Sequence, residues 1–239
     1  MNKQSLYFTA PYETSIRQST VDVGDGELLV ETSVSSVSAG TELLIYRGEA
    51  PAELPADKTL DTLDGDLSFP LRYGYAAVGE VVAVGEAVDD DWMGQSVFAF
   101  NPHETRFSIT PENVIPVPEG VSAEEMAIFP SVETATSLVL DGAPRVGEDV
   151  VVFGAGVVGL CTIAILSSFP LDRLVVVEPI GARRDRAEAM GADVAVAPAE
   201  LDTALDLDTH GESAPDRSHP AGADLVYELS GQPQTLDDA

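Results

Sequence analysis

Hydrophobic residues in the first half of the chain recur in short runs that are bounded by Gly, Pro, Asp or Asn. Four of these runs predict β-strands: "ELLVETSVSS" after the turn "GDG", then "YAAVGEVVAVG", "SVFAF" and "RFSIT". Short strands at this spacing are typical of a small barrel-like β domain. Between the first two runs, "VSAGTELLIYRG" (37–48) predicts the end of a half-buried strand, a sharp turn at Gly40 and an apolar-faced helical turn.

The pattern changes after about residue 120. Ser122 followed by Glu125 matches a capping box and predicts a helical stretch that runs toward Leu140. Beyond it, strand-like and helix-like segments alternate: "DVVVF", "GVVGLCTIAILSS", "LVVVE", "ARRDRAEAM", "DVAVA" and "DLVYELSG". This alternation predicts a parallel sheet with crossover helices, so the fold class is α/β. We expect the polar, acidic segment 198–223 to be a solvated loop.

The segment from Val150 to Leu171 contains no charged residue, which raises the possibility of a membrane helix. It begins with β-branched residues, is interrupted by three glycines and ends at Pro170. A buried strand followed by a buried helix fits that pattern better, so we expect no membrane span. The N-terminus lacks the apolar core of a signal peptide.

The chain is strongly acidic, with 41 Asp and Glu against 12 Lys and Arg and a net charge of −29. Such a surface repels phosphates, so nucleic acid is excluded as a partner. Acidic residues spread along the whole length are typical of proteins from a salt-rich cytoplasm, where salt screens the self-repulsion. The single cysteine, Cys161, lies in an apolar helical segment and is expected in the core. One cysteine forms no intramolecular disulfide, which fits a reducing, cytoplasmic location.

A glycine motif follows the strand "DVVVF". Gly154, Gly156 and Gly159 form G-x-G-x-x-G at the mouth of the helix that Val157 and Val158 begin. In a dinucleotide-binding turn the first glycine allows the tight bend, the second lets the backbone approach a pyrophosphate, and the third lets helix and strand pack. The helix N-terminus attracts the phosphate charge. The alternative is a glycine turn in a parallel sheet of another kind.

Glu178 closes the next predicted strand, "LVVVE", 24 residues after Gly154 (178 − 154). A carboxylate at this position accepts hydrogen bonds from the adenosine ribose hydroxyls. It also repels a 2′-phosphate, so NAD is favoured as the cofactor. Arg183 and Arg184 could instead bind that phosphate, which keeps NADP as the alternative.

The order and spacing of these motifs resemble the medium-chain dehydrogenase/reductase superfamily, the fold of zinc alcohol dehydrogenases and quinone reductases. The resemblance spans nearly the whole chain: the β domain, "GAGVVG", "VVVEPIGARRDRAEAMGAD" and "GADLVYELSG". It implies a GroES-like catalytic domain over residues 1–121. It also implies a partial Rossmann domain over 122–239, with about four of the six strands. A nicotinamide cofactor, a small-molecule substrate and a homodimeric full-length form are implied as well.

The positions that bind zinc in members of this superfamily differ here. Zinc members typically read Cys-Gly-Thr-Asp where this chain reads "AGTE" (39–42), and Gly-His-Glu where it reads "GYA" (74–76). At the third ligand position only Glu133 could coordinate a metal. We therefore expect no catalytic zinc, and the four-cysteine lobe for structural zinc is missing from the sequence. A zinc site with displaced ligands, such as Glu133 and His103, is the less favoured alternative.

Two hydroxyl groups are the predicted catalytic residues. The resemblance places Thr41 at the position of the proton-relay hydroxyl and Tyr75 at the vacated histidine position. We expect Tyr75 to donate a hydrogen bond to the substrate oxygen and Thr41 to relay the proton. Alternatively, Tyr75 packs a domain interface and Thr41 caps a helical turn. His103, in "NPHE", is either an acid/base or an ordinary loop residue.

Within the superfamily, "SAGTE" and "YGYAAVGEVV" look most like bacteriochlorophyllide-type hydroxyethyl dehydrogenases that lack zinc ligands. This implies a secondary alcohol or ketone attached to a conjugated system. Compared with that family the sequence stops before the last Rossmann strands, which predicts a truncated chain with an unpaired strand edge at "DLVYEL". Two functions stay open: a zinc-independent NAD(P)-dependent oxidoreductase, or a nucleotide-binding or interaction protein that has lost catalysis.

Overall fold

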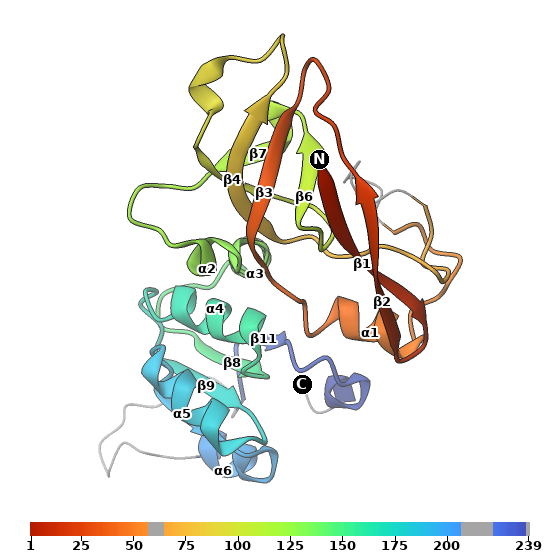
Figure 1. Cartoon of the computed structure of the whole chain (residues 1–239). Coiled ribbons are helices and arrows are strands. Elements are labelled where there is room, and N and C mark those ends of the chain that lie inside the picture. The colour runs from red at the N-terminus through yellow and green to blue at the C-terminus, as the bar shows by residue number, and fades with distance from the viewer. Residues whose placement is uncertain (57–64, 207–221, 238–239) are drawn as a thin grey trace. The chain divides into compact units, whose positions relative to one another are not determined.

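The computed structural model describes residues 1–56, 65–206 and 222–237 (Figure 1). The chain divides into two compact units, Met1–Pro130 and Ser131–Ala239. The division falls nine residues after the expected boundary at residue 121 (130 − 121). The reason is that Met126 and Ala127 pack with Val78 and Phe98 in the core of the first unit.

The first unit is built from antiparallel strands. Its five-stranded sheet has the order β6-β3-β4-β5-β7, and β1 and β2 form a separate hairpin. The strands are β1 (Asn2–Ala10), β2 (Glu13–Thr20), β3 (Leu28–Ser35), β4 (Ala77–Val84), β5 (Ser96–Ala99), β6 (Arg106–Ile109) and β7 (Val114–Pro116). All four runs that predicted strands form them, as β3, β4, β5 and β6. The hairpin β1–β2 and the short β7 were not predicted.

Alternating side chains of the five-stranded sheet fill the main core of the first unit. Leu28 and Val30 of β3 pack with Val81 of β4, Val97 of β5 and Phe107 of β6, and all five are buried. Leu28 and Val30 are two residues apart, the spacing that places side chains on the same face of a strand. The sheet therefore forms a stable base for the loops at its ends.

In the stretch 37–48 the predicted turn and helix form, but the strand end predicted at its start does not, because β3 ends at Ser35. After β3 the chain turns at Gly40 and enters helix α1 (Thr41–Arg47). Gly48 ends the helix in the left-handed conformation, with φ at 73°, and its amide donates to the Ile45 carbonyl. A residue without Cβ is suited to this position. Ile45 anchors the helix in a second cluster with Phe8, Leu71 and Tyr73.

The second unit is a parallel sheet with helices on both faces. The sheet order is β10-β9-β8-β11, from β8 (Asp149–Phe153), β9 (Arg173–Val177), β10 (Val194–Val196) and β11 (Leu225–Glu228). This is the 3-2-1-4 order of a dinucleotide-binding half-sheet. Strand β11 lies at one edge of the described sheet, as predicted.

Each face of the parallel sheet has its own core. Val150 and Val152 of β8 pack with Ile163 of helix α4 and Ala187 of helix α5. On the other face, Phe153 packs with Ala204 of helix α6 among other residues. The helices are α4 (Val157–Leu166), α5 (Gly181–Ala189) and α6 (Leu201–Asp206). The uncharged segment 150–171 is thus a buried strand and helix, and no helix among the described residues is long and apolar enough to cross a membrane.

Two segments differ from expectation. The helical stretch after Ser122 has its predicted capping box but is split into α2 (Ala123–Met126) and α3 (Phe129–Gly142). Pro130 lies in the first turn of α3, where its missing N–H is tolerated. The predicted loop 198–223 is wrong at its start, because 198–206 forms a 3₁₀ turn and α6, with Ala204 buried. Residues 207–221 lie outside the described residues. The 3₁₀ turns are Asp90–Trp92, Pro111–Asn113, Pro198–Glu200 and Pro233–Asp237.

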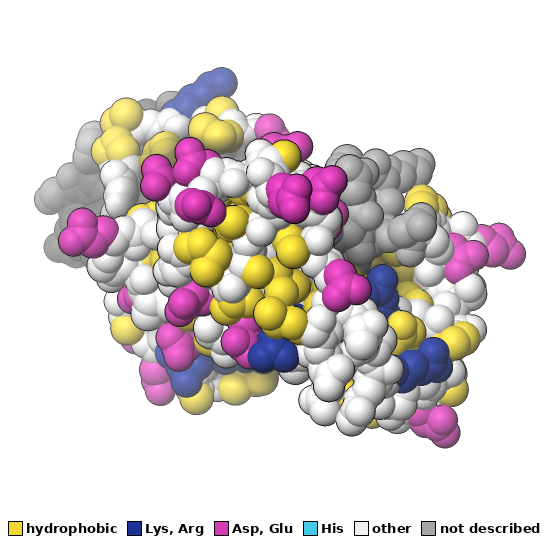
Figure 2. Space-filling model, turned by 45° about the horizontal axis from the view of Figure 1, so that its top comes forward, with side chains coloured by type: hydrophobic (Ala, Val, Ile, Leu, Met, Phe, Trp, Pro, Cys, Tyr) yellow, Lys and Arg dark blue, Asp and Glu magenta, His cyan; other side chains and the backbone are white. Residues whose placement is uncertain are grey.

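The surface carries the charge that the composition indicates. Figure 2 shows acidic side chains scattered over one face, with few Lys and Arg among them. The acidic residues are not gathered into one patch on this face. The repulsion is therefore distributed, and salt can screen it.

Candidate functional site

The glycine turn of the second unit has the geometry that a dinucleotide requires. Gly154 has φ at 94°, and a Cβ built on it would lie 2.7 Å from the Ser230 backbone. A Cβ on Gly159 would lie 2.1 Å from the Gly154 carbonyl oxygen. A Cβ on Gly156, in contrast, would meet nothing within 4 Å. The first and third glycines are thus required by the fold, whereas the second faces open space that a ligand can use.

Helix α4 begins directly at this open space. Gly156 is the N-cap residue and makes no side-chain cap. The first amides of a helix have no partner within it, and the helix dipole places partial positive charge there. Val157, half-exposed, and Val158 provide amides at this end. The start of α4 is therefore suited to a phosphate group.

Glu178 lies at the carboxyl end of β9, next to the glycine turn. It is 2% exposed. Its Oε2 accepts a hydrogen bond from the Ala155 amide at 2.9 Å, and its Oε1 accepts one from the Ile180 amide at 2.9 Å. A carboxylate oxygen can accept a second hydrogen bond. Glu178 is thus fixed against the turn and keeps acceptor capacity for a ribose hydroxyl.

Arg183 and Arg184, which follow Glu178 in sequence, also lie next to it in the structure. Arg183 Nη1 lies 3.8 Å from Glu178 Oε2, and the arginine side chain is half-exposed. Arg184 Nη1 instead donates to the backbone carbonyls of Glu178, at 2.7 Å, and Pro179, at 2.9 Å. Arg184 therefore holds the loop after β9, whereas Arg183 is the cation available to a ligand beside Glu178.

A second polar cluster lies in the first unit. Nε2 of His103 lies 2.7 Å from Oε2 of Glu42, and Nδ1 of His103 is hydrogen-bonded to the Ser35 hydroxyl. Oε1 of Glu42 accepts the Ser38 amide at 2.9 Å. Glu42 and His103 are buried, at 1% and 9% exposure, and Ser35 is partly exposed. The three side chains form a hydroxyl–imidazole–carboxylate chain from the partly exposed end of β3 to a buried carboxylate.

This cluster connects the two segments that contain the predicted catalytic residues. Glu42 follows Thr41, the exposed first residue of α1. On the other side, a Cβ on Gly74 would lie 2.7 Å from the His103 ring, and Gly74 has φ at 127°. Tyr75 is partly buried, with its ring 6.2 Å from that of Tyr73 and nearly perpendicular to it. Tyr75 thus packs in the cluster around Tyr73 and Ile45, and its role, like that of Thr41, stays a prediction.

The residue after His103 forms a separate ionic contact. Glu104 is 6% exposed and accepts hydrogen bonds from Lys3 Nζ at 2.9 Å, from Ser5 Oγ at 2.9 Å and from Arg72 Nη1. Its charge is neutralised by two cations. Glu42 is therefore the carboxylate that acts on the His103 ring.

The residues at the positions that the sequence resemblance assigns to zinc are poor ligands. Ala39 has no donor atom, and the phenol of Tyr75 replaces an imidazole. Both ring nitrogens of His103 already have partners, and Glu133 is exposed on α3. Within residues 1–56, 65–206 and 222–237, no group of three or more His, Cys, Asp or Glu side chains is placed to hold a metal. The absence of zinc remains a prediction that rests on this donor set.

Cys161 takes no part in either cluster. It is partly buried on α4, and burial raises the pKa of its thiol. A thiol with a raised pKa is a weak nucleophile at neutral pH. The sequence predicted Cys161 in the core, whereas the structure places it only partly buried, outside the fully buried core.

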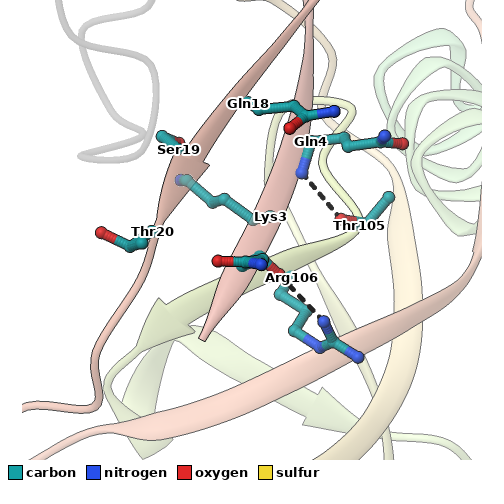
Figure 3. Close-up of a pocket in the computed structure, with 8 residues that line it drawn as sticks. Lys3, Gln4, Gln18, Ser19, Thr20, Thr105 and Arg106 are labelled. Carbon is teal, nitrogen blue, oxygen red and sulfur yellow. Dashed lines mark hydrogen bonds between the residues drawn. The ribbon is translucent and has the colours of Figure 1, made fainter.

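A surface cavity of about 600 Å³ lies elsewhere in the first unit (Figure 3). The residues that line it are all of polar or charged type and come from β1, β2 and the start of β6: Asn2, Lys3, Gln4, Gln18, Ser19, Thr20, Thr105 and Arg106. Its two cations are already engaged, Lys3 with Glu104 and Arg106 with Glu31 and the Asn2 carbonyl. The cavity contains no residue of the glycine turn or of the His103 cluster, so it is not the candidate site.

Sequence reasoning placed the glycine turn beside Glu178 but did not identify the full polar cluster. The spacing of Gly154, Gly156 and Glu178 was sufficient to place them together. Glu42 and Ser35 were missed as functional residues, because their partner His103 is 61 and 68 residues away in sequence. The signal that could have identified them is a carboxylate inside an otherwise apolar helical turn, "TELLIY".

Comparison with known proteins finds relatives that are dehydrogenases. No family model matches the chain. D-guloside 3-dehydrogenase of Escherichia coli K12 is 25% identical over 225 residues, which cover 89% of this chain and 62% of the relative. The chain thus spans less than two thirds of that relative's length.

Solved structures show the same fold. An alcohol dehydrogenase from E. coli CFT073, complexed with NADH, has a TM-score of 0.68 at 17% identity and covers 99% of this chain and 86% of its own. The quinone oxidoreductase of Thermus thermophilus, also solved with NADPH, has a TM-score of 0.70 at 20% identity, with coverages of 98% and 69%. The fold is α/β, with a GroES-like β domain followed by a Rossmann-type sheet, as the sequence predicted.

Proposed function

We propose that the chain is part of an NAD(P)-dependent oxidoreductase that transfers a hydride between the nicotinamide and an alcohol, carbonyl or conjugated carbonyl substrate. The observation that carries this proposal is the arrangement of Gly156 and Glu178. Gly156 leaves open space at the start of α4, and the buried Glu178 carboxylate is fixed 2.9 Å from the Ala155 amide of the same turn. These residues fit the pyrophosphate and the adenosine ribose of a dinucleotide.

The residues present support NAD as the preferred cofactor. Glu178 would accept hydrogen bonds from the ribose hydroxyls and would repel a 2′-phosphate. Arg183 partly neutralises Glu178 and keeps NADP as the second possibility. When bound, the nicotinamide supplies hydride-transfer chemistry. The turn residues hold the phosphates, and Glu178 orients the adenosine end.

The substrate class follows from the relatives and the vacated metal positions. The curated relative is a dehydrogenase of a glycoside, and one structural neighbour is a quinone oxidoreductase. A substrate with a conjugated carbonyl could spread developing charge and would need a hydrogen-bond donor in place of a metal. The likeness to bacteriochlorophyllide-type enzymes supports such a substrate. We assign Tyr75 as that donor, and the resemblance alone gives Thr41 as a candidate proton-relay hydroxyl.

We further propose that catalysis proceeds without zinc, since Ala39 and Tyr75 stand at two of the three metal positions. Metal analysis of a chelator-washed sample tests this point directly. A structural or catalytic zinc site binds its metal tightly and retains it through a chelator wash. Because we propose no such site, the washed protein should contain less than about one tenth of an equivalent of zinc. One equivalent, retained through chelation, would restore the zinc-enzyme alternative.

The experiment for the main proposal measures turnover in molar KCl. The purified chain is incubated with NAD⁺ or NADP⁺ and a panel of glycosides, polyols and secondary alcohols, and with NADH or NADPH and quinones or conjugated ketones. Cofactor-dependent conversion that Tyr75→Phe lowers by about 10²-fold or more supports the assignment. Saturable NADH binding without any turnover would instead support a nucleotide-binding protein without catalysis. Unchanged turnover in Tyr75→Phe would remove that residue from the mechanism.

A further inference from the structure

The polar cluster of the first unit has an order that resembles an acid/base device. A carboxylate, an imidazole and a hydroxyl are joined in sequence: Glu42 Oε2 to His103 Nε2 at 2.7 Å, and His103 Nδ1 to the Ser35 hydroxyl. Each nitrogen of the ring has one partner. The inference that follows rests on the proposed hydride transfer, which requires a route for the substrate proton.

The buried end of the chain determines where the ring holds its proton. Glu42 is 1% exposed, and a buried ionised carboxylate requires hydrogen-bond donors. Ser38 N–H supplies one at 2.9 Å, and His103 Nε2–H is placed to supply the other. With the proton on Nε2, the neutral ring presents the lone pair of Nδ1 to the Ser35 hydroxyl.

The surroundings keep the ring in this orientation. The absence of a side chain at Gly74 is needed, because a Cβ there would lie 2.7 Å from ring atoms of His103. The neighbouring carboxylate, Glu104, is paired with Lys3 and Arg72 and does not compete with Glu42. The backbone of His103 is fixed as well, since its carbonyl accepts the Leu6 amide at 2.9 Å.

We propose that Ser35, His103 and Glu42, in place of Thr41, form the proton relay of the hydride-transfer reaction, because they are joined by hydrogen bonds whereas the role of Thr41 rests on the resemblance alone. In the oxidising direction, an NAD(P)⁺ held as proposed by the glycine turn and Glu178 would accept the hydride of the alcohol C–H bond, and the alcohol O–H proton would have to leave to a base. The O–H proton passes to the Ser35 oxygen as the Ser35 proton passes to His103 Nδ1. The imidazolium that forms is stabilised by Glu42. Reduction reverses each transfer. Glu42 and His103 act through Ser35 and are positioning and relay groups.

The arrangement explains why Ser35 is the outer end of the relay. Of the three side chains it is the partly exposed one, at the carboxyl end of β3, whereas the other two are buried. A hydroxyl bonded to an oriented imidazole gives up its proton more readily than an isolated hydroxyl. Ser36, the next residue along the chain, donates its amide to Ala76 and provides a matched serine outside the relay.

The first test needs no turnover. ¹⁵N spectra of the imidazole nitrogens, assigned by loss of the His103 signals in His103→Gln, report which nitrogen carries the proton. The relay requires a proton on Nε2 and a free, hydrogen-bonded Nδ1. We expect Ser35→Ala to shift the Nδ1 resonance and Ser36→Ala to leave it in place. A proton on Nδ1 at the pH of the assay overturns the relay, whatever the activity of the chain.

The second test compares kcat, KM, NADH binding and the pH profile in the same variants. We expect His103→Gln to lower kcat by about 10²-fold or more, Ser35→Ala to lower it by about 10-fold or more, and Ser36→Ala to leave it unchanged. The pH dependence of kcat should flatten in His103→Gln. NADH binding should persist in all of these variants, because the residues proposed to bind NADH lie in the second unit. If the wild-type chain turns over substrate and His103→Gln has the same kcat and pH profile, the relay is overturned while the proposed hydride transfer stands. Wild-type inactivity overturns the proposed hydride transfer and with it the relay, whereas the ¹⁵N result then still decides whether the three side chains have the proposed hydrogen-bond order.

Discussion

Glu42 Oε2 and His103 Nε2 lie 2.7 Å apart, although 61 residues separate them in sequence. The contact joins the helical turn after β3 to the loop after β5. Both side chains are buried, so Glu42 Oε2 and His103 Nε2 depend on each other for a hydrogen-bond partner. Removing one member of a buried polar pair typically costs several kcal/mol, which makes this contact a structural requirement as well as a candidate for chemistry.

The space around His103 can be tested at Gly74. Alanine at this position is unfavourable for two reasons: φ is 127°, and its Cβ would lie 2.7 Å from the imidazole ring. Gly94→Ala is the matched control, because Gly94 has φ at 75° but open space around it. In urea unfolding, we expect Gly94→Ala to lower the free energy of unfolding by about 1 kcal/mol. Gly74→Ala should lower it by at least about 1 kcal/mol more. Equal losses would show that the ring tolerates a neighbour at this position.

Cofactor preference depends on Glu178. Glu178→Gln keeps the size of the side chain but removes the charge that binds ribose hydroxyls and repels a 2′-phosphate. We expect the Kd for NADH to rise by about 10-fold and the preference for NADH over NADPH to shrink or reverse. Asp185→Asn, a charge removal at an exposed position of α5, is the control. If both variants bind the two cofactors as wild type does, Glu178 does not contact the ribose.

Tyr227 presents a buried hydroxyl without a hydrogen-bond partner among the described residues. Burial, and secondly the charge of Glu148, raises the pKa of Tyr227. A raised pKa in the folded state means that stability is fully present below the unfolded value of about 10 and is lost as pH rises beyond it. Tyr227→Phe should match or exceed wild-type stability at neutral pH and should lose less above pH ~10. Thermal unfolding at both pH values measures this, and a large loss at neutral pH would reveal a partner for the hydroxyl.

Salt should stabilise this chain. With 41 acidic and 12 basic residues, self-repulsion favours expansion in dilute buffer. We expect the Tm to rise as KCl is increased from about 0.1 M, where the Debye length is roughly 10 Å, to about 1 M, where it is roughly 3 Å. A Tm that is independent of KCl would contradict the interpretation of the composition as salt-adapted.

The sequence predicts the second unit better than the first, for a physical reason. In a parallel sheet each strand is buried on both faces, so β8 and β9 appear as apolar runs, and the intervening Gly154–Gly159 turn has its own spacing. In the first unit the hairpin β1–β2 escaped prediction because β2 is almost entirely exposed and its sequence, "ETSIRQST", has a single apolar residue. Residues 13–20 form a strand because they pair with β1, and their own composition does not indicate one.

The candidate sites follow the same division. The cofactor residues are close in sequence and share one sheet edge, so a local motif predicts them. Ser35, Glu42 and His103 are brought together by the pairing of β3 with β4 and by the hydrogen bonds of residues 103–105 with β1. No single stretch of sequence contains that information. Helix α6 was missed because the acidic segment around it has a loop-like composition, whereas Ala204 packs on the sheet.

The most direct measurement is a fluorescence titration of the wild-type chain, Gly156→Ala and Gly154→Ala with NADH in molar KCl. A Cβ on Gly156 meets nothing within 4 Å in the protein itself, so this variant should keep its fold by circular dichroism. A Cβ on Gly154 would strike the Ser230 backbone, so that variant should be destabilised. If Gly156 borders the cofactor, wild type binds NADH saturably and the folded Gly156→Ala binds at least about 10-fold more weakly. NADH binding of equal strength in wild type and Gly156→Ala, or no binding by the folded wild-type chain, would contradict the assignment of this turn as a dinucleotide site.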